Sequence, residues 1–103
     1  MSMQDRAKEM EARYRQDEEL RFRVQSRRDY MFGEWLAAHF GLDGDEADAY
    51  ARQIVAESLK MPGDEDIISK ALADSESHGK TLAREDCVAK LQEFQATAFK
   101  ELS

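Results

Sequence analysis

A chain of 103 residues fits one domain with or without a tail, and its 42% hydrophobic content without any long apolar run indicates a globular protein that is not membrane-inserted. A single cysteine excludes an internal disulfide, and the N-terminus lacks the apolar run of a secretory signal, so we expect a cytoplasmic protein. The net charge of −7 lies entirely in residues 43–103, which excludes nucleic acid as a favourable partner. Glycine and proline breakers divide the chain into segments with helical periodicity.

The first predicted element is an N-terminal arm, residues 1–19, that contains little to bury. Its apolar residues form a narrow seam: Met3, Ala7, Met10 and Tyr14. Its acid-before-base pairs at i, i+4 are Glu9–Arg13, Glu11–Arg15, Asp17–Arg21 and Glu19–Arg23. Together these pairs add only about 1–2 kcal/mol to a helix. We therefore expect the free arm to be disordered or transiently helical, and helical when docked on a partner. A solvated extension with no role is the alternative.

The next segment, residues 20–40, carries the strongest helical pattern. Its apolar residues recur on one helix face, and the stripe widens toward the C-terminal end. They are Leu20, Val24, Met31, Phe32, Trp35, Leu36, Ala38 and Phe40. Gly33 interrupts this pattern and weakens a helix by about 1 kcal/mol relative to alanine. A close helix crossing beside Trp35 would explain the glycine, and a tolerated surface position is the alternative.

Three shorter helices are predicted after this segment. The second helix opens at Asp45 with Asp48 placed nearly as in a capping box; the third opens at Asp64, and the fourth opens near Thr81 as its N-cap. The buried face predicted for the second helix consists of Ala47, Tyr50, Ala51, Ile54, Val55, Ser58 and Leu59. That of the third helix consists of Ile67, Ile68, Ala71 and Leu72, and that of the fourth consists of Leu82, Val88, Leu91, Phe94, Ala98 and Leu102. Short connections between amphipathic helices predict an all-α four-helix bundle, residues 20–103, with a mobile N-terminal arm.

The sequence lacks the residue patterns typical of catalysis or metal binding. His39, His78 and Cys87 do not have the spacing of metal ligands, and Cys87 fits a structural helix position better than a nucleophile. The acidic run from Asp43 lacks the glycine and glutamate of an EF-hand loop. The carboxylates at 64–66 fit helix capping better than acid–base work, and no glycine-rich phosphate-binding motif occurs. We therefore expect no enzyme activity and no metal.

Two adjacent arginines, Arg27 and Arg28, point about 100° apart on a helix, so at most one of them lies over the edge of the core. The simpler interpretation is surface pairing with Asp29 or with the acidic second helix. The alternative is a weak anion or phosphate site near Tyr30 and Trp35, where an aromatic ring helps to hold a base. The residues alone leave both interpretations open.

An ordered set of motifs resembles one known family. The motifs are Glu19-Leu20-Arg21-Phe22-Arg23, Arg27-Arg28-Asp29-Tyr30-Met31-Phe32-Gly33-Glu34-Trp35-Leu36-Ala37-Ala38, Gly41-Leu42, Tyr50-Ala51 and Pro62-Gly63-Asp64-Glu65-Asp66. The family is the zeta subunit of alphaproteobacterial ATP synthase, an inhibitor of the rotary enzyme's ATPase activity. The resemblance covers essentially the whole chain, and the Arg-Arg-x-x-x-x-Gly-x-Trp run and the Pro-Gly-Asp-Glu-Asp turn are its most specific parts.

The resemblance implies a four-helix bundle whose mobile N-terminal segment enters a catalytic interface of the ATPase head, between alpha and beta subunits and near the gamma subunit. There the segment folds as a helix and blocks hydrolytic rotation. The partner-binding residues indicated by the seam and by the resemblance are Met3, Asp5, Arg6, Met10, Glu11, Arg13 and Tyr14. The family also binds ADP or ATP weakly, for which the candidate residues are Arg27, Arg28 and Trp35. No other cofactor is expected.

Two positions depart from the family pattern. Met3-Gln4 stand where phenylalanine often precedes the Asp-Arg pair, and Asp29 replaces the commoner asparagine after the two arginines. We expect a protein that is monomeric when free and associates with the membrane-bound ATP synthase only through the catalytic head. A helical adaptor, or an adenine-nucleotide-sensing module with an inert N-terminal tail, is the alternative.

Overall fold

The computed structural model describes the backbone of residues 3–103 and the side chains from Glu18 onward. It contains four helices: α1 (Met3–His39), α2 (Gly44–Ser58), α3 (Glu65–Ser77) and α4 (Arg84–Leu102). No strand occurs in this part of the chain, so the predicted all-α fold is confirmed. Within the same residues, no helix combines the length and the apolar character needed to cross a bilayer.

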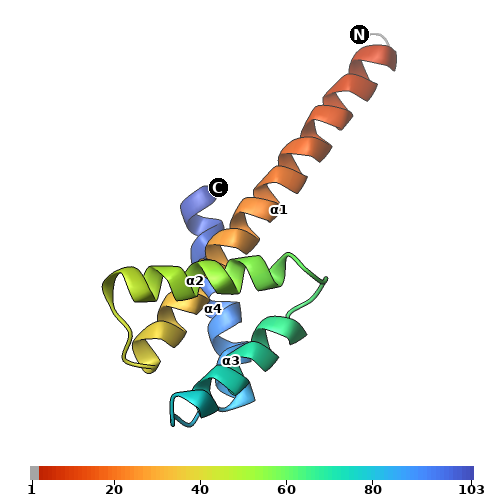
Figure 1. The fold of residues 1–103 in the computed structure, drawn as a ribbon. Coiled ribbons are helices and arrows are strands. Elements are labelled where there is room, and N and C mark those ends of the chain that lie inside the picture. Colours follow the sequence, from red (N-terminus) through yellow and green to blue (C-terminus); the bar gives the residue numbers. More distant parts are fainter. Residues whose placement is uncertain (1–2) are drawn as a thin grey trace.

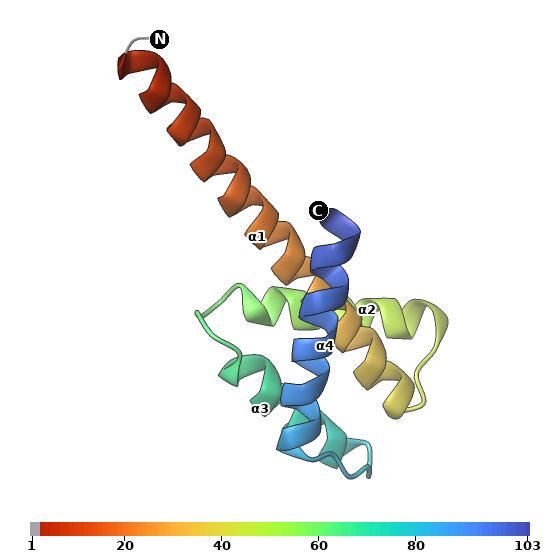
Figure 2. The same cartoon turned by 180° about the vertical axis from the view of Figure 1, so that it is seen from behind.

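The C-terminal half of α1 is the centre of the bundle. α2 lies across it, and α4 runs beside it and ends close to the point where α1 leaves the bundle (Figures 1 and 2). α3 packs against α2 and α4. The N-terminal part of α1 extends away from the other helices, which gives the molecule an elongated shape with extents of 63 × 25 × 22 Å.

One hydrophobic core joins all four helices. Its buried members are Phe32, Leu36, Ala37 and Phe40 around the end of α1, Tyr50 and Ile54 of α2, Ile67, Ile68 and Ala71 of α3, and Cys87 and Leu91 of α4. Burial of each large apolar side chain stabilises the fold by about 1.5–3 kcal/mol. The predicted apolar faces of the four helices therefore meet, and they hold the second half of α1 in place.

Gly33 lies where α1 crosses α2 at very short range. A Cβ atom at this position would stand 2.5 Å from the Cα atom of Ala51, a distance that real side chains do not adopt. Glycine on one helix and alanine on the other let the two backbones approach this closely. The predicted close crossing is confirmed, and the interpretation of Gly33 as a surface glycine is wrong.

The chain leaves α1 through a hydrogen-bonded turn at Gly41. The amide of Leu42 donates to the carbonyl of Ala37 at 2.8 Å, and the amide of Gly41 donates to the carbonyl of Ala38 at 3.1 Å. This Schellman arrangement needs a left-handed residue, and Gly41 supplies it with a φ of 82°. The turn directs Leu42 back onto the core and sends the chain into α2.

The predicted helix caps are partly wrong. α2 begins at Gly44 after Asp43, and α4 begins at Arg84 after Ala83 instead of near Thr81. Asp64 does precede α3, but its side chain makes no cap hydrogen bond. The carboxylate of Asp64 bonds Arg28 instead, because a guanidinium is a stronger donor than a neutral backbone amide.

Some positions on the predicted apolar faces are exposed to solvent. Leu59 follows the end of α2, and Val88 and Leu102 lie near the two ends of α4, where neighbouring helices no longer cover them. The pair Glu19–Arg23 forms no ion pair in the described part of the chain, in keeping with the small energy of exposed pairs.

Candidate partner-binding site

The N-terminal part of α1 is the predicted partner-binding arm. Its backbone is helical from Met3, and Figures 1 and 2 show it extending from the bundle with no other helix alongside. The predicted partner-binding residues are Met3, Asp5, Arg6, Met10, Glu11, Arg13 and Tyr14, and their side chains lie outside the described residues. The mobility expected for residues 1–19 stays a prediction.

The exposed fraction of the side chains changes where α1 enters the bundle. Glu18 and Glu19 are exposed, Leu20 is half-buried, and Val24 is the first buried residue of the described side chains. Phe22 points away from the core and is 58% exposed. The described core therefore begins one to two helical turns after the arm.

Arg28 ties α1 to the start of α3. Its Nε and one terminal nitrogen donate to Oδ1 of Asp29 at 3.0 and 2.8 Å. The guanidinium also donates to the two carboxylate oxygens of Asp64, at 2.8 and 3.4 Å. The predicted pairing with Asp29 is therefore present, but the second carboxylate comes from the connection before α3 rather than from α2. Arg28 is also largely buried, with a side chain only 11% exposed.

Asp29 is fully buried beside Arg28, although the sequence suggested a surface charge. No donor of the described chain contacts its Oδ2 atom, and the single proton of the Ser58 hydroxyl is donated to the Val55 carbonyl at 2.7 Å. Burial raises the pKa of Asp29 above its ordinary value, and the neighbouring Arg28 guanidinium opposes this rise only in part. Asp29 therefore belongs to the interior of the bundle.

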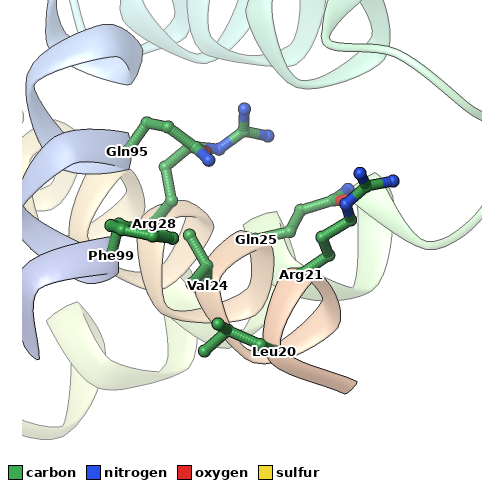
Figure 3. A pocket seen from close by; sticks show the side chains of 7 residues that line it. All are labelled: Leu20, Arg21, Val24, Gln25, Arg28, Gln95 and Phe99. Atoms are coloured by element: carbon green, nitrogen blue, oxygen red, sulfur yellow. The ribbon is translucent and has the colours of Figure 1, made fainter. Parts of the chain in front are cut away.

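A pocket of about 680 Å³ lies beside Arg28, between α1 and α4. It is lined by Leu20, Arg21, Val24, Gln25, Arg28, Gln95 and Phe99 (Figure 3). In this view the polar ends of Arg21 and Gln25 point away from Leu20 and Phe99, so the pocket has a polar side and an apolar side. Two carboxylates already neutralise Arg28, whereas Arg21 makes no ion pair with any side chain that the structure describes; Asp17, its predicted partner, lies outside them.

The three candidate nucleotide-binding residues do not share one pocket. Arg28 lines the pocket of Figure 3, whereas Arg27 lies on another face of α1. The ring of Trp35 packs against Phe32, with 5.9 Å between ring centroids, and Lys90 Nζ lies 5.8 Å from its centre. Nucleotide binding at these residues stays a prediction.

Cys87 has the environment of a structural residue. It is completely buried, and burial raises the pKa of its thiol, so the thiol stays protonated at neutral pH and is unsuited to nucleophilic attack. Among the residues whose side chains are described, no three His, Cys, Asp or Glu side chains are grouped to hold a metal ion.

Sequence reasoning missed the burial of Asp29 and the contact made by Asp64. The signal for this burial was present in the sequence: Asp29 precedes Phe32 by one helical turn and Leu36 by two, so it shares the core face of the helix with them. Asp64 offered no such signal, because its bond to Arg28 joins positions 36 residues apart and depends on the fold.

Comparison with known proteins agrees with this geometry. The chain is similar to a solved structure described as the solution NMR structure of a protein, with 31% sequence identity and a TM-score of 0.72 over 81% of this chain and 94% of that chain. No curated protein matches the chain. A family model described as ATPase inhibitor subunit zeta matches residues 1–101. Because this match spans both the arm and the bundle, the chain belongs to the ATPase inhibitor subunit zeta family.

Proposed function

We propose that this protein inhibits ATP hydrolysis by the catalytic head of ATP synthase, and that the N-terminal part of α1 is the inhibitory element. One observation carries the proposal: this part of the helix extends from the bundle with no other described helix alongside. Its family is named for ATPase inhibition. An amphipathic helix without burial of its own gains that burial in a groove of a partner.

In the proposed complex the arm enters an interface between alpha and beta subunits of the head, near the gamma subunit. Met3, Met10 and Tyr14 act as apolar anchors, because their spacing places them along one seam of the helix. Arg6 and Arg13 meet carboxylates of the head. The inserted helix blocks the subunit movements of hydrolytic rotation, so inhibition requires binding and no chemistry by this chain.

The bundle anchors the arm in this proposal. Phe32 and Leu36 fix the second half of α1 in the core, so the inserted arm continues a helix that the bundle holds. The protein reaches the membrane-bound enzyme from the cytoplasm, through the catalytic head alone.

An ATP-hydrolysis assay on the purified cognate head tests this function. Deleting residues 1–19 removes no described core residue, so we expect the truncated protein to stay folded and to lose inhibition. Far-UV circular dichroism and thermal unfolding of the truncated protein control for its fold. If the intact protein fails to inhibit hydrolysis, the function is wrong. If the truncated protein inhibits as strongly as the intact one, the role of the arm is wrong.

A further inference from the structure

A groove of about 570 Å³ runs along α1 on the face opposite the pocket of Figure 3. Tyr30 and Asp48 line part of this groove, and the Tyr30 hydroxyl donates to the Asp48 carboxylate. The apolar wall of the groove consists of Phe22, Val55 and Leu102, contributed by three helices, and Arg23, Arg27 and Arg52 line its edges. We call these six residues the basic groove. Phe22 is 58% exposed and Leu102 is 40% exposed, so large apolar side chains face solvent there. Isolated exposed apolar residues are ordinary, whereas these side chains come from three helices and lie around one shallow groove.

The arginines of the basic groove keep free donors. Arg27 bonds Glu101 through Nε at 3.1 Å, and Arg52 bonds Asp48 through Nε at 2.9 Å. In the described part of the chain the two terminal nitrogens of both guanidinium groups make no hydrogen bond, and Arg23 forms no ion pair. Paired terminal nitrogens match the geometry of a carboxylate. The groove therefore suits an acidic partner, although the chain as a whole carries a net charge of −7.

The basic groove lies at the base of the arm. Phe22 is one turn beyond Glu19, and the C-terminal end of α4, which carries Leu102, lies beside α1 where it leaves the bundle (Figures 1 and 2). Because the basic groove adjoins the arm along α1, a partner that encloses the arm also lies next to the groove. An interface along the arm would continue directly into it.

We propose that the basic groove is a second docking surface, and that it binds an acidic, partly apolar surface segment of the ATPase head at the mouth of the cleft that the arm enters. This inference rests on the proposed function, because it takes the arm as inserted in the head. The bundle then contributes to affinity directly, and it is more than a carrier of the arm.

Inhibition of ATP hydrolysis by the full chain tests the apolar wall. We expect Phe22→Ala and Leu102→Ala each to raise the half-inhibitory concentration about tenfold. Leu59→Ala is the control for Phe22, since Leu59 is 59% exposed and does not line the groove. Val88→Ala is the control for Leu102, since Val88 is 38% exposed and lies about 21 Å away along α4. Both controls should stay within about twofold of the wild type.

A charge reversal tests the acidic character of the partner. We expect Arg23→Glu to raise the half-inhibitory concentration and to reduce its dependence on ionic strength, because a screened attraction has been removed. Lys80→Glu makes the same change of charge at an exposed position in the connection before α4 and should leave both quantities unchanged.

The outcomes separate this inference from the proposed function. If the wild type inhibits and the groove variants inhibit as well as their controls, the second docking surface is wrong and the inhibitor function stands. If the wild type does not inhibit at all, the function itself is wrong. Sedimentation at the assay concentration that shows a dimer broken by Phe22→Ala would assign the groove to a second copy of this chain and overturn the inference. NMR contacts between the groove and the arm in the free protein would also overturn it.

Discussion

At the scale of single residues, Gly33 controls how closely α1 approaches α2. We expect Gly33→Ala to lower the free energy of unfolding by about 2 kcal/mol, because forcing a Cβ against the Ala51 backbone outweighs the gain of about 1 kcal/mol in helix propensity. Urea denaturation measures the change. Adding Ala51→Gly should restore little of the lost stability, since the atom nearest to the new Cβ is the backbone Cα of residue 51, which glycine keeps. An equal or higher stability of the single variant would contradict the close crossing.

Arg28 and Asp29 should respond unequally to substitution. Arg28→Met leaves a buried carboxylate without its cation, so we expect the free energy of unfolding at neutral pH to fall by about 3 kcal/mol. Asp29→Asn leaves Arg28 bonded to Asp64 and removes a poorly solvated charge, so we expect a change below about 1 kcal/mol. Urea denaturation of both variants checks this asymmetry. An equal loss in the free energy of unfolding for both variants would contradict this expectation, because it would show that Arg28 and Asp29 contribute only through their mutual charge attraction.

Burial of Asp29 also predicts a pH dependence. A carboxyl group whose pKa is higher in the folded than in the unfolded state binds its proton more tightly when folded. Its contribution to stability is therefore present below about pH 4 and is lost as the pH rises through the folded-state pKa. We expect the wild type to lose stability relative to Asp29→Asn as the pH rises from about pH 4 toward neutrality. Unfolding measured across this range checks the sign, with the exposed variant Glu76→Gln as control; a constant difference would contradict it.

At the scale of elements, α1 is one helix with two environments. From Val24 onward it is held by burial in the core, whereas the arm has no described helix beside it, and its sequence offers it only i, i+4 pairs of opposite charge. Side-chain packing supplies most of a helix's stability in proteins. We therefore expect the same backbone geometry to cover two very different local stabilities.

Hydrogen exchange of the free protein tests this difference. We expect the backbone amides of residues 7–18 to exchange rapidly and those of Phe32, Leu36 and their neighbours to be protected to nearly the level of global unfolding. Binding to the ATPase head should then slow exchange in the arm. Equal protection along the whole of α1 in the free protein would contradict the predicted mobile arm.

At the scale of the whole molecule, the extended arm determines the overall size. The Cα radius of gyration is 17.1 Å, whereas a compact domain of this length has about 13 Å. We expect small-angle X-ray scattering of a monomer to give a radius of gyration well above that of a compact domain, and deletion of residues 1–19 to bring it close to about 12 Å. A compact value for the intact protein would mean that the arm folds back onto the bundle.

Particular residues show how far the sequence determines this protein. The apolar spacing of Phe32, Leu36 and Phe40 defined the core face of α1, and Gly33 within that stripe predicted a close helix crossing. These features are local, because helical geometry alone decides which side chains share a face. The ends of α2 and α4 were placed less well, since the predicted cap of α4, Thr81, competes with neighbouring residues of similar propensity.

The sequence by itself determined the all-α class, the helices, most of their buried faces and the poverty of apolar residues in the arm, because all of these depend on residues close along the chain. Only the tertiary structure decided that Arg28 bridges Asp29 and Asp64, and that Phe22, Val55 and Leu102 of three helices form one groove. The physical reason is that such contacts depend on how the helices cross, and the crossing is decided by packing of the whole core.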